Sequence, residues 1–415
     1  MPPPPIPAPQ LASSPSPALR TKLLWIAALY FSSGFPFGLI NYSLPVYLRT
    51  GGASLPLIGR LVSDVGAAWT FKFLWSPLVD RIGTRKAWIL SCQVGLAVLT
   101  VGLALTDPAR ATPYLWVLLI TLAALSATQD IAIDAYTIEL LDQREMGIAN
   151  GVRVTAYRVA LLVTSGTLLS LVRPLGWSRV WVVGAAALLL VAAITLTLPS
   201  TRRAPRGQAI TEPLVALFRR PLLPVVVLFA LTFKLGDLAM QPMTAPFAVD
   251  RGLTTDQLGL LGYVSIASVI AGALLGGVLT SRWGIFRALW TLGLVQALSN
   301  LGYFAAAAPG APRGTVFAAG ALEQLTGGLG TAAFLAFLMS LCDKRYAATQ
   351  YAFLSALFGA SRWIAGRYSG DMVQAMGYQR YFLLTFVLAF PAFLLLPLVR
   401  RVRPAADEAA EPAAA

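Results

Sequence analysis

Long apolar stretches separated by short polar segments cover most of the chain. Twelve stretches are each long enough for the ~20 apolar residues that a helix needs to cross a bilayer. They lie near residues 22–47, 54–79, 87–106, 113–141, 149–172, 178–198, 222–248, 256–280, 287–307, 314–341, 348–376 and 379–399. The pattern predicts an all-α polytopic membrane protein with twelve spanning helices.

The polar segments divide this helical region and mark its ends. The longest internal one, 199–221, holds five arginines and one acidic residue and separates two halves of six helices, 22–198 and 222–400. Residues 1–21 contain eight prolines, and 401–415 follow the last apolar stretch, so we expect two disordered cytoplasmic tails. The first tail lacks the basic region and short apolar core of a signal peptide, so the first apolar stretch is expected to be retained.

Basic residues lie mainly on one side of the predicted helices. If the N-terminus is cytoplasmic, the loops and tails of that side hold 18 Lys and Arg residues, the other side holds 7, and 7 more lie within the spans. Cytoplasmic loops of membrane proteins carry an excess of basic residues, so both termini are predicted to be cytoplasmic. This bias accounts for the net charge of +14, and we expect no nucleic-acid partner.

Two short motifs recur at one fixed offset. The segment 81–83 (Arg-Ile-Gly) returns as 282–284 (Arg-Trp-Gly), and 142–144 (Asp-Gln-Arg) returns as 343–345 (Asp-Lys-Arg), both 201 residues later. Two matches in register, in equivalent cytoplasmic loops, indicate an internal duplication. Six plus six helices with a basic central loop is the architecture of the major facilitator fold, whose halves are parallel repeats.

The composition narrows the class of protein and of site. Hydrophobic residues make up 57% of the chain and charged residues 12%, about half the charged share of soluble proteins. The chain has no histidine and two cysteines in separate apolar segments, so a zinc or haem site lacks a ligand set. We therefore expect no metal and no cofactor. The sequence also lacks a nucleophile–base set and a Gly-rich phosphate loop, which argues against an enzyme.

Acidic residues inside the predicted spans are the candidates for proton coupling. Charges in the bilayer are costly, so they are rare and mark polar interiors or functional sites. Asp130 and Asp134 stand one helical turn apart on one helix face. Asp237 follows Lys234 by three residues, and Glu323 lies near small residues. Without histidine, any proton relay must use these carboxylates. The alternative is that the charges pair only to hold the bundle together.

Other polar and aromatic residues of the spans are candidates for the substrate cavity. Arg158 can supply a cation beside the two aspartates of the fourth span, and Gln324 lies next to Glu323. Aromatic rings could stack on a small aromatic ligand, although most rings in spans pack helices or lie at the interface. The candidate set is Tyr30, Phe35, Tyr42, Gln129, Arg158, Lys234, Gln324 and Arg362.

The segment after the second span, 76–86, reads Ser-Pro-Leu-Val-Asp-Arg-Ile-Gly-Thr-Arg-Lys. It resembles the signature loop of major facilitator transporters, in which Asp-Arg-x-Gly precedes basic residues. The resemblance implies a cytoplasmic gating latch whose aspartate meets the helix dipole and the charges of the other half. The counterpart in the second half has Ser281 at the aspartate position. The predicted latch residues are Asp80, Arg81, Gly83, Arg85, Arg282 and Gly284.

Several further segments resemble the AmpG-type permeases of the same superfamily. They are 71–78, 129–135, 234–237, 286–289, 327–334, 349–351 and 354–357, and the resemblance covers nearly all of residues 22–400. That family imports anhydro-muropeptides during cell-wall recycling and is described as proton-driven. The chain differs from it by ending after twelve helices, without the extra C-terminal spans of the family.

The compact size and the segment 34–49 instead resemble the siderophore permeases of the superfamily, the rhizobactin- and pyochelin-type importers of the bacterial inner membrane. We therefore expect a monomeric inner-membrane importer of a siderophore, free or ferric. It would work by alternating access in the lipid bilayer and use the proton gradient. Two alternatives stay open: an importer of anhydro-muropeptides, and a membrane protein that senses its ligand without transporting it.

Overall fold

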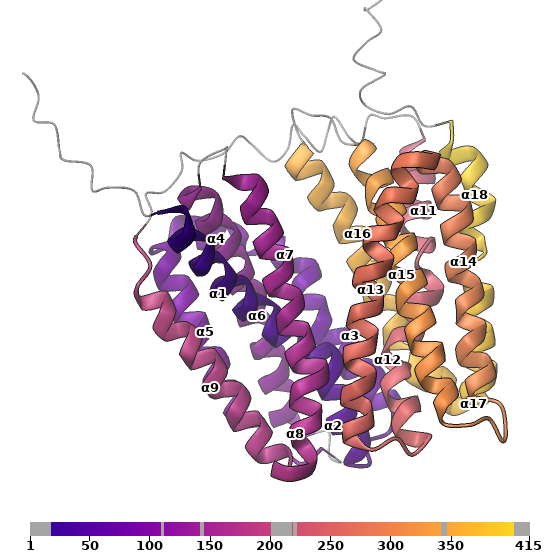
Figure 1. Ribbon diagram of the computed structural model, residues 1–415, viewed down its shortest axis with the longest axis horizontal. Coiled ribbons are helices and arrows are strands. Elements are labelled where there is room, and N and C mark those ends of the chain that lie inside the picture. The colour runs from indigo at the N-terminus through magenta and orange to yellow at the C-terminus, as the bar shows by residue number, and fades with distance from the viewer. Residues whose placement is uncertain are drawn as a thin grey trace, which may run out of the picture.

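The chain folds into a bundle of long helices whose first and last helices have their free ends on the same side, at the top of Figure 1. The computed structural model describes residues 18–108, 112–141, 145–200, 218, 222–341 and 347–401. Within these residues every regular element is helical, as the apolar pattern predicts. The predicted tails and the 199–221 linker lie mostly outside the described residues, as do the motifs 142–144 and 343–345.

The first half of the chain forms the first six predicted spans, coloured indigo to magenta in Figure 1. Their elements are α1 (Leu19–Gly38), η1 (Leu39–Ser43), α2 (Leu44–Thr50), α3 (Leu55–Phe71), η2 (Lys72–Leu74), α4 (Ser76–Arg81), α5 (Arg85–Leu103), α6 (Pro113–Leu140), α7 (Met146–Leu162), η3 (Val163–Thr167), α8 (Leu168–Leu175) and α9 (Trp177–Leu196). The short elements η1 and η3 are π-helical turns inside the first and fifth spans, and η2 is a 3₁₀ turn in the second.

The second half forms the other six spans. Its elements are α11 (Leu223–Thr232), α12 (Leu235–Asp250), α13 (Thr255–Trp283), α14 (Ile285–Ala306), α15 (Gly314–Ser340), α16 (Ala347–Arg367), α17 (Ser369–Leu388) and α18 (Pro391–Val399). Nine helical runs of the described residues are long and apolar enough to cross a membrane. The other three predicted spans contain α3, α14 and α16, which are shorter or more polar than those nine runs.

Side-chain caps set where several helices begin. The Thr84 hydroxyl accepts a hydrogen bond from the backbone of the first turn of α5, and Thr112 does the same for α6. At α13, Thr254 and Gln257 form a complete capping box. Each cap satisfies backbone N–H groups that have no partner inside the helix. The chain therefore turns at defined residues between the spans.

The 201-residue offset seen in the sequence returns in the backbone. Gly83 and Gly284, in the turns after the second and eighth spans, both have positive φ, 62° and 79°. Gly176 and Gly377, before the sixth and twelfth spans, have φ of 77° and 79° and the same ψ of 160°. Glycine is the residue that adopts these angles without steric cost. The equal angles at equivalent positions support the internal duplication, and Gly377 interrupts α17 where the last two predicted spans meet.

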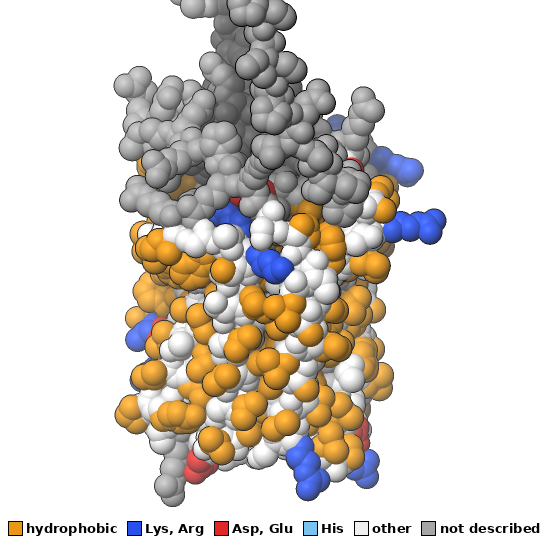
Figure 2. Space-filling view, turned by 90° about the vertical axis from the view of Figure 1, so that its left-hand side faces the viewer, with side chains coloured by type: hydrophobic (Ala, Val, Ile, Leu, Met, Phe, Trp, Pro, Cys, Tyr) orange, Lys and Arg blue, Asp and Glu red, His pale blue; other side chains and the backbone are white. Residues whose placement is uncertain are grey.

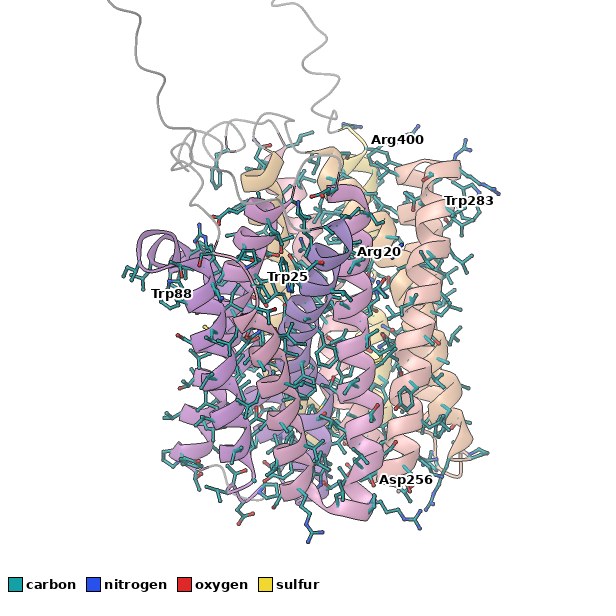
Figure 3. The ribbon with its side chains drawn as sticks, turned by 60° about the vertical axis from the view of Figure 1, so that its left-hand side comes forward. Arg20, Trp25, Trp88, Asp256, Trp283 and Arg400 are labelled. Carbon is teal, nitrogen blue, oxygen red and sulfur yellow. The ribbon has the colours of Figure 1, made fainter. Side chains whose placement is uncertain are left out.

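The surface has the layout of a membrane protein. On the face shown in Figure 2, hydrophobic side chains cover the middle, and most charged side chains lie near the two ends. Figure 3 shows Arg400 and the 43%-exposed ring of Trp283 near the upper end and Asp256 near the lower end. Basic and tryptophan side chains are enriched where lipid meets water. We call the end at which α1 begins and α18 ends cytoplasmic, and the other end periplasmic.

The buried core is shared between the halves only toward the periplasmic end. One cluster there joins Leu48 and Trp181 of the first half to Phe247 and Tyr381 of the second. Toward the cytoplasmic end each half has a buried cluster of its own. The cluster of the first half contains Tyr136, and that of the second half contains Phe334. The two halves are thus packed together at one end and separately packed at the other, with a cavity between them.

Candidate functional site

A cavity of about 540 Å³ lies between the halves, near the middle of the spans. Its wall is built from α1, α6 and α7 of the first half and from α12, α13, α15 and α16 of the second. The polar and aromatic side chains of the wall are Tyr30, Ser33, Tyr42, Lys72, Asp130, Asp134, Arg153, Tyr157, Arg158, Lys234, Asp237, Gln241, Glu323, Gln324, Thr331, Phe358 and Arg362. Both signs of charge therefore face the same space.

The two aspartates of α6 form the acidic part of the wall in the first half. Asp130 accepts a hydrogen bond from Ser33 Oγ at 2.6 Å and lies 3.9 Å from Lys72 Nζ. One turn later, Asp134 accepts a hydrogen bond from Tyr30 Oη at 2.6 Å. Arg153 of α7 lies 3.5 Å from the same carboxylate oxygen and 4.7 Å from the centroid of the Tyr30 ring. Each aspartate thus has one hydroxyl donor from α1 and one cation.

The seventh span is broken where it passes the cavity. α11 ends at Thr232 and α12 begins at Leu235, and Lys234 occupies the break. Its ammonium group lies 3.4 Å from Asp237 Oδ2, 2.5 Å from Gln296 Oε1 and 3.1 Å from the Gly327 carbonyl oxygen. Broken helices at the membrane midplane are a common element of transporter binding sites, because the freed backbone groups face a polar cavity.

Glu323 of α15 is the least neutralised acid of the wall. Its side chain is largely buried, and Gln324 Nε2 donates a hydrogen bond to it at 2.9 Å. Among the described residues it forms no ion pair, whereas Asp130, Asp134 and Asp237 each do. Among the described contacts, a hydrogen bond alone therefore compensates its charge.

Most of the sequence-predicted residues lie on this cavity. All four predicted coupling acids line it, and so do six of the eight predicted substrate-cavity residues: Tyr30, Tyr42, Arg158, Lys234, Gln324 and Arg362. These positions are compatible with the predicted roles, which stay predictions.

Phe35 and Gln129 do not line this cavity. Phe35 is fully buried on the opposite side of α1, where its ring packs 5.8 Å from Phe31. Gln129 is also fully buried and donates to Ser32 Oγ at 2.9 Å. Successive residues of a helix point about 100° apart, so a neighbour of a cavity residue faces the core.

Several wall residues were missed by the sequence prediction. Ser33 follows Tyr30 by one helical turn, and Gln241 follows Asp237 in the same way, so helical spacing from a predicted residue would have found both. Lys72 carried the same signal as the predicted acids, a charge inside a predicted span, and it reaches the cavity from the 3₁₀ turn η2.

The described latch residues lie at the cytoplasmic ends of the spans. Arg85 donates to Glu139 Oε1 at 3.2 Å and to the Val79 carbonyl oxygen at 3.1 Å, so these contacts stay within the first half. Arg282 is exposed in the last turn of α13, and Gly83 and Gly284 make the turns described above. The side chains of the aspartate and first arginine of the latch lie outside the described part of the structure.

Within the described residues, four ion pairs join the halves near the periplasmic end. They are Arg49–Asp250, Arg60–Asp371, Asp64–Arg367 and Arg173–Asp256. The first is bidentate, at 2.5 and 2.6 Å, and the hydroxyl of Tyr378 donates to the same aspartate at 2.7 Å. Its two residues stand 201 positions apart, at the ends of the first and seventh spans, so it joins equivalent positions of the duplicated halves.

Glycines bring the backbones of the two halves into close contact at the same end. A Cβ atom added at Gly370 would collide with the carbonyl group of Leu55, and one added at Gly262 would collide with that of Ser165. Small residues allow membrane helices to approach in this way. The periplasmic end is therefore closed by both packing and charge.

Comparison with known proteins gives a consistent set of relatives. Residues 26–366 match the profile of the family described as Major Facilitator Superfamily. The chain is 35% identical over 397 residues to the anhydromuropeptide permease of Escherichia coli strain K12, covering 92% of this chain and 80% of that one. It is 33% identical to an uncharacterized protein of Haemophilus influenzae, covering 90% and 93% of the two chains.

A solved structure shares the fold. The crystal structure of a bacterial homologue of the human lysosomal transporter Spinster, in an inward-facing and unoccupied conformation, superposes with a TM-score of 0.74. It covers 94% of this chain and 98% of its own, at 17% sequence identity. At this low sequence identity, the structural likeness supports the fold alone and says nothing about the transported solute.

Proposed function

Since the chain belongs to the major facilitator superfamily and, within it, to the AmpG-like permeases, we propose that it imports anhydro-muropeptides from the periplasm to the cytoplasm. It is a multi-pass secondary transporter of the bacterial inner membrane. The observation that carries the proposed substrate is the 35% identity to the Escherichia coli anhydromuropeptide permease over 92% of the chain. The chain covers 80% of that permease, so the likeness extends through both halves.

The siderophore expected from the sequence is not supported by the relatives, which favour the muropeptide alternative. The cavity wall agrees with that choice, because it is dominated by charged and amide side chains rather than by stacked aromatic rings. A sugar–peptide carries hydroxyl, amide, amine and carboxylate groups, which such a wall can bind.

The proposed transport cycle is alternating access. In the arrangement described, the four ion pairs and the glycine contacts seal the periplasmic end, while the described cytoplasmic ends pack within their own halves. Rocking of the halves about the cavity would open the sealed end and close the other. We propose that the halves are 22–198 and 222–400, joined by the linker 199–221, and that one chain suffices for transport.

We also propose that protons drive the import through the cavity carboxylates. Asp130 and Asp134 are stacked one turn apart, so protonation of one relieves their mutual repulsion and weakens the attraction of Lys72 and Arg153. Asp237 and Glu323 provide a second acidic pair in the other half. A change of charge at these sites would alter how strongly each half holds its own cations.

Uptake by proteoliposomes tests the substrate and the coupling together. We expect a pH gradient that is acidic outside the liposomes to drive uptake of a radiolabelled 1,6-anhydro-muramyl peptide, and counterflow to exchange it, whereas a labelled ferric siderophore is not taken up. A sensor would bind the peptide without counterflow. Asp130→Asn is expected to abolish gradient-driven uptake while counterflow persists. Full gradient-driven uptake by Asp130→Asn would rule out its coupling role, and siderophore uptake would overturn the proposed substrate.

A further inference from the structure

Two arginines on the cavity wall have no carboxylate partner. Arg158 comes from α7 in the first half, and Arg362 comes from α16 in the second. Within the described parts of the chain, Arg158 forms neither an ion pair nor a hydrogen bond. Arg362 bonds only to an uncharged group: its Nε and Nη2 donate to Gln241 Oε1 at 3.2 and 2.6 Å. A half-buried guanidinium in a membrane protein is costly unless an anion accepts its hydrogen bonds.

The remaining cations of the wall are already neutralised. Lys72 and Arg153 face the two aspartates of α6, and Lys234 faces Asp237. These three pairs each lie within one half, so they are not available to hold a solute between the halves. The spare positive charge of the cavity is therefore concentrated at Arg158 and Arg362.

Tyrosines complete the surroundings of these two arginines. Tyr42 of η1 and Tyr157 of α7 line the same cavity as the two arginines. The ring of Phe37 lies 5.6 Å from the Arg362 guanidinium and helps to fix its position. A guanidinium group only donates hydrogen bonds and a phenol hydroxyl can donate one, so these side chains offer several donors to a bound anion.

The first and fifth spans are shaped to present these groups. Tyr42 lies in the π-helical turn η1, and Arg158 lies just before the π-helical turn η3. The two turns pack against each other, and Ser43 Oγ donates to the carbonyl oxygen of Thr164 at 2.7 Å. π-Helical turns inside α-helices occur often at functional sites, because the extra residue redirects side chains. Tyr42 in the first of these spans and Arg158 in the fifth both line the cavity.

We propose that Arg158 and Arg362, together with Tyr42 of the same cavity wall, bind a carboxylate group of the transported solute and so determine that the solute must be anionic. The identity of the solute as a muropeptide rests on the proposed function, whereas the anion site rests on the cavity itself. A carboxylate bound there accepts hydrogen bonds from both halves at once. The bound anion therefore stabilises the conformation in which the halves approach each other around the solute.

Equilibrium binding to the purified protein tests this site. The probes are a labelled 1,6-anhydro-muramyl peptide with free carboxylates and the same compound with its carboxylates converted to carboxamides. We expect the wild-type protein to bind the carboxylate form about 10- to 100-fold more tightly, the range of one charge-assisted hydrogen bond. Arg158→Gln and Arg362→Gln should bind both forms alike, and Arg→Lys variants should keep part of the preference. Arg179→Gln, which removes an exposed arginine far from the cavity, is the matched control.

A smaller probe separates this site from the proposed substrate. Glutarate at millimolar concentration should raise the unfolding temperature of the wild-type protein and of Arg179→Gln by a few degrees over sodium chloride of equal ionic strength. It should not do so for Arg158→Gln or Arg362→Gln. If glutarate acts in this way while the muropeptide does not bind, the anion site stands and the proposed substrate falls. If the variants respond to glutarate as the wild type does, or keep the full preference for the carboxylate peptide, the anion site is wrong.

Discussion

The Arg49–Asp250 pair should control how often the periplasmic end opens. The pair is bidentate, at 2.5 and 2.6 Å, and Tyr378 adds a third hydrogen bond to the same carboxylate. The two side chains are about one-quarter exposed, 24% and 26%. Because the pair joins the two halves, every hydrogen bond in it must break before this end can open. Asp250→Asn removes the negative charge and keeps the size of the side chain.

The structure gives the size of the expected effect. Hydrogen bonds to charged groups contribute about 1.5–3 kcal/mol when buried, and partial exposure lowers this range to about 1–2 kcal/mol. A change of that size shifts a two-state equilibrium by about 5- to 30-fold. We therefore expect Asp250→Asn to increase the ratio of outward-open to inward-open molecules by this factor, with little change in overall stability.

Distance measurements between spin labels can detect the shift. Labels at Ser178→Cys and Pro312→Cys lie at exposed periplasmic positions of opposite halves, in a protein from which Cys92 and Cys342 have been removed. The Asp250→Asn variant should gain population at longer distances.

Two further variants make the test decisive. Tyr378→Phe removes one neutral donor from the same carboxylate, so it should show a smaller shift in the same direction. The double variant Arg49→Asp with Asp250→Arg should restore the original distribution, because it rebuilds the pair in reverse. An unchanged distance distribution in Asp250→Asn would refute the idea that this pair holds the end closed.

Two other variants probe the packing between the halves and the charge at the broken helix. Gly370→Ala places a methyl group against the Leu55 carbonyl, so it should favour the outward-open state in the same spin-label assay. The control is Gly277→Ala, whose added methyl group meets open space and should leave the distances unchanged. Equal distance distributions in the two variants would argue against close packing at Gly370. Lys234→Met leaves Asp237 without its cation and should destabilise the protein by about 3–5 kcal/mol, measured by thermal unfolding. Adding Asp237→Asn should recover most of that loss, and a single variant with wild-type stability would show that the pair contributes little.

The sequence predicted the fold well because only helices and closed β-barrels can span a bilayer, and long apolar stretches indicate helices. Each apolar stretch forms helix in the described residues, and most predicted boundaries fall within a few residues of the helix ends. The 201-residue offset, found from two motifs, also relates Gly176 to Gly377 and Arg49 to Asp250. A duplicated sequence gives duplicated turns, so the symmetry of the halves could be foreseen.

The cavity was harder to predict than the spans. Charge in a membrane segment identified the acidic residues, because a buried charge must face something polar. Aromatic and amide side chains have no such constraint, which explains why Phe35 and Gln129 proved to be core residues. The ion pairs between the halves could not be foreseen either, since partners such as Asp64 and Arg367 are far apart in the chain and meet only in the assembled bundle.

The position of the ion pairs between the halves has a consequence for the two solutions that the protein separates. Arg49–Asp250, Arg60–Asp371 and Arg173–Asp256 lie near the periplasmic surface, with several of their side chains more than one-third exposed. Dissolved salt screens such pairs, since the Debye length falls from about 30 Å at 0.01 M to about 10 Å at 0.1 M ionic strength. Salt in the outer medium therefore acts directly on the contacts that close this end. The transporter should open to the outside more readily as the salinity of its surroundings rises, so the ionic strength of the outer solution would shift the balance between its two open states.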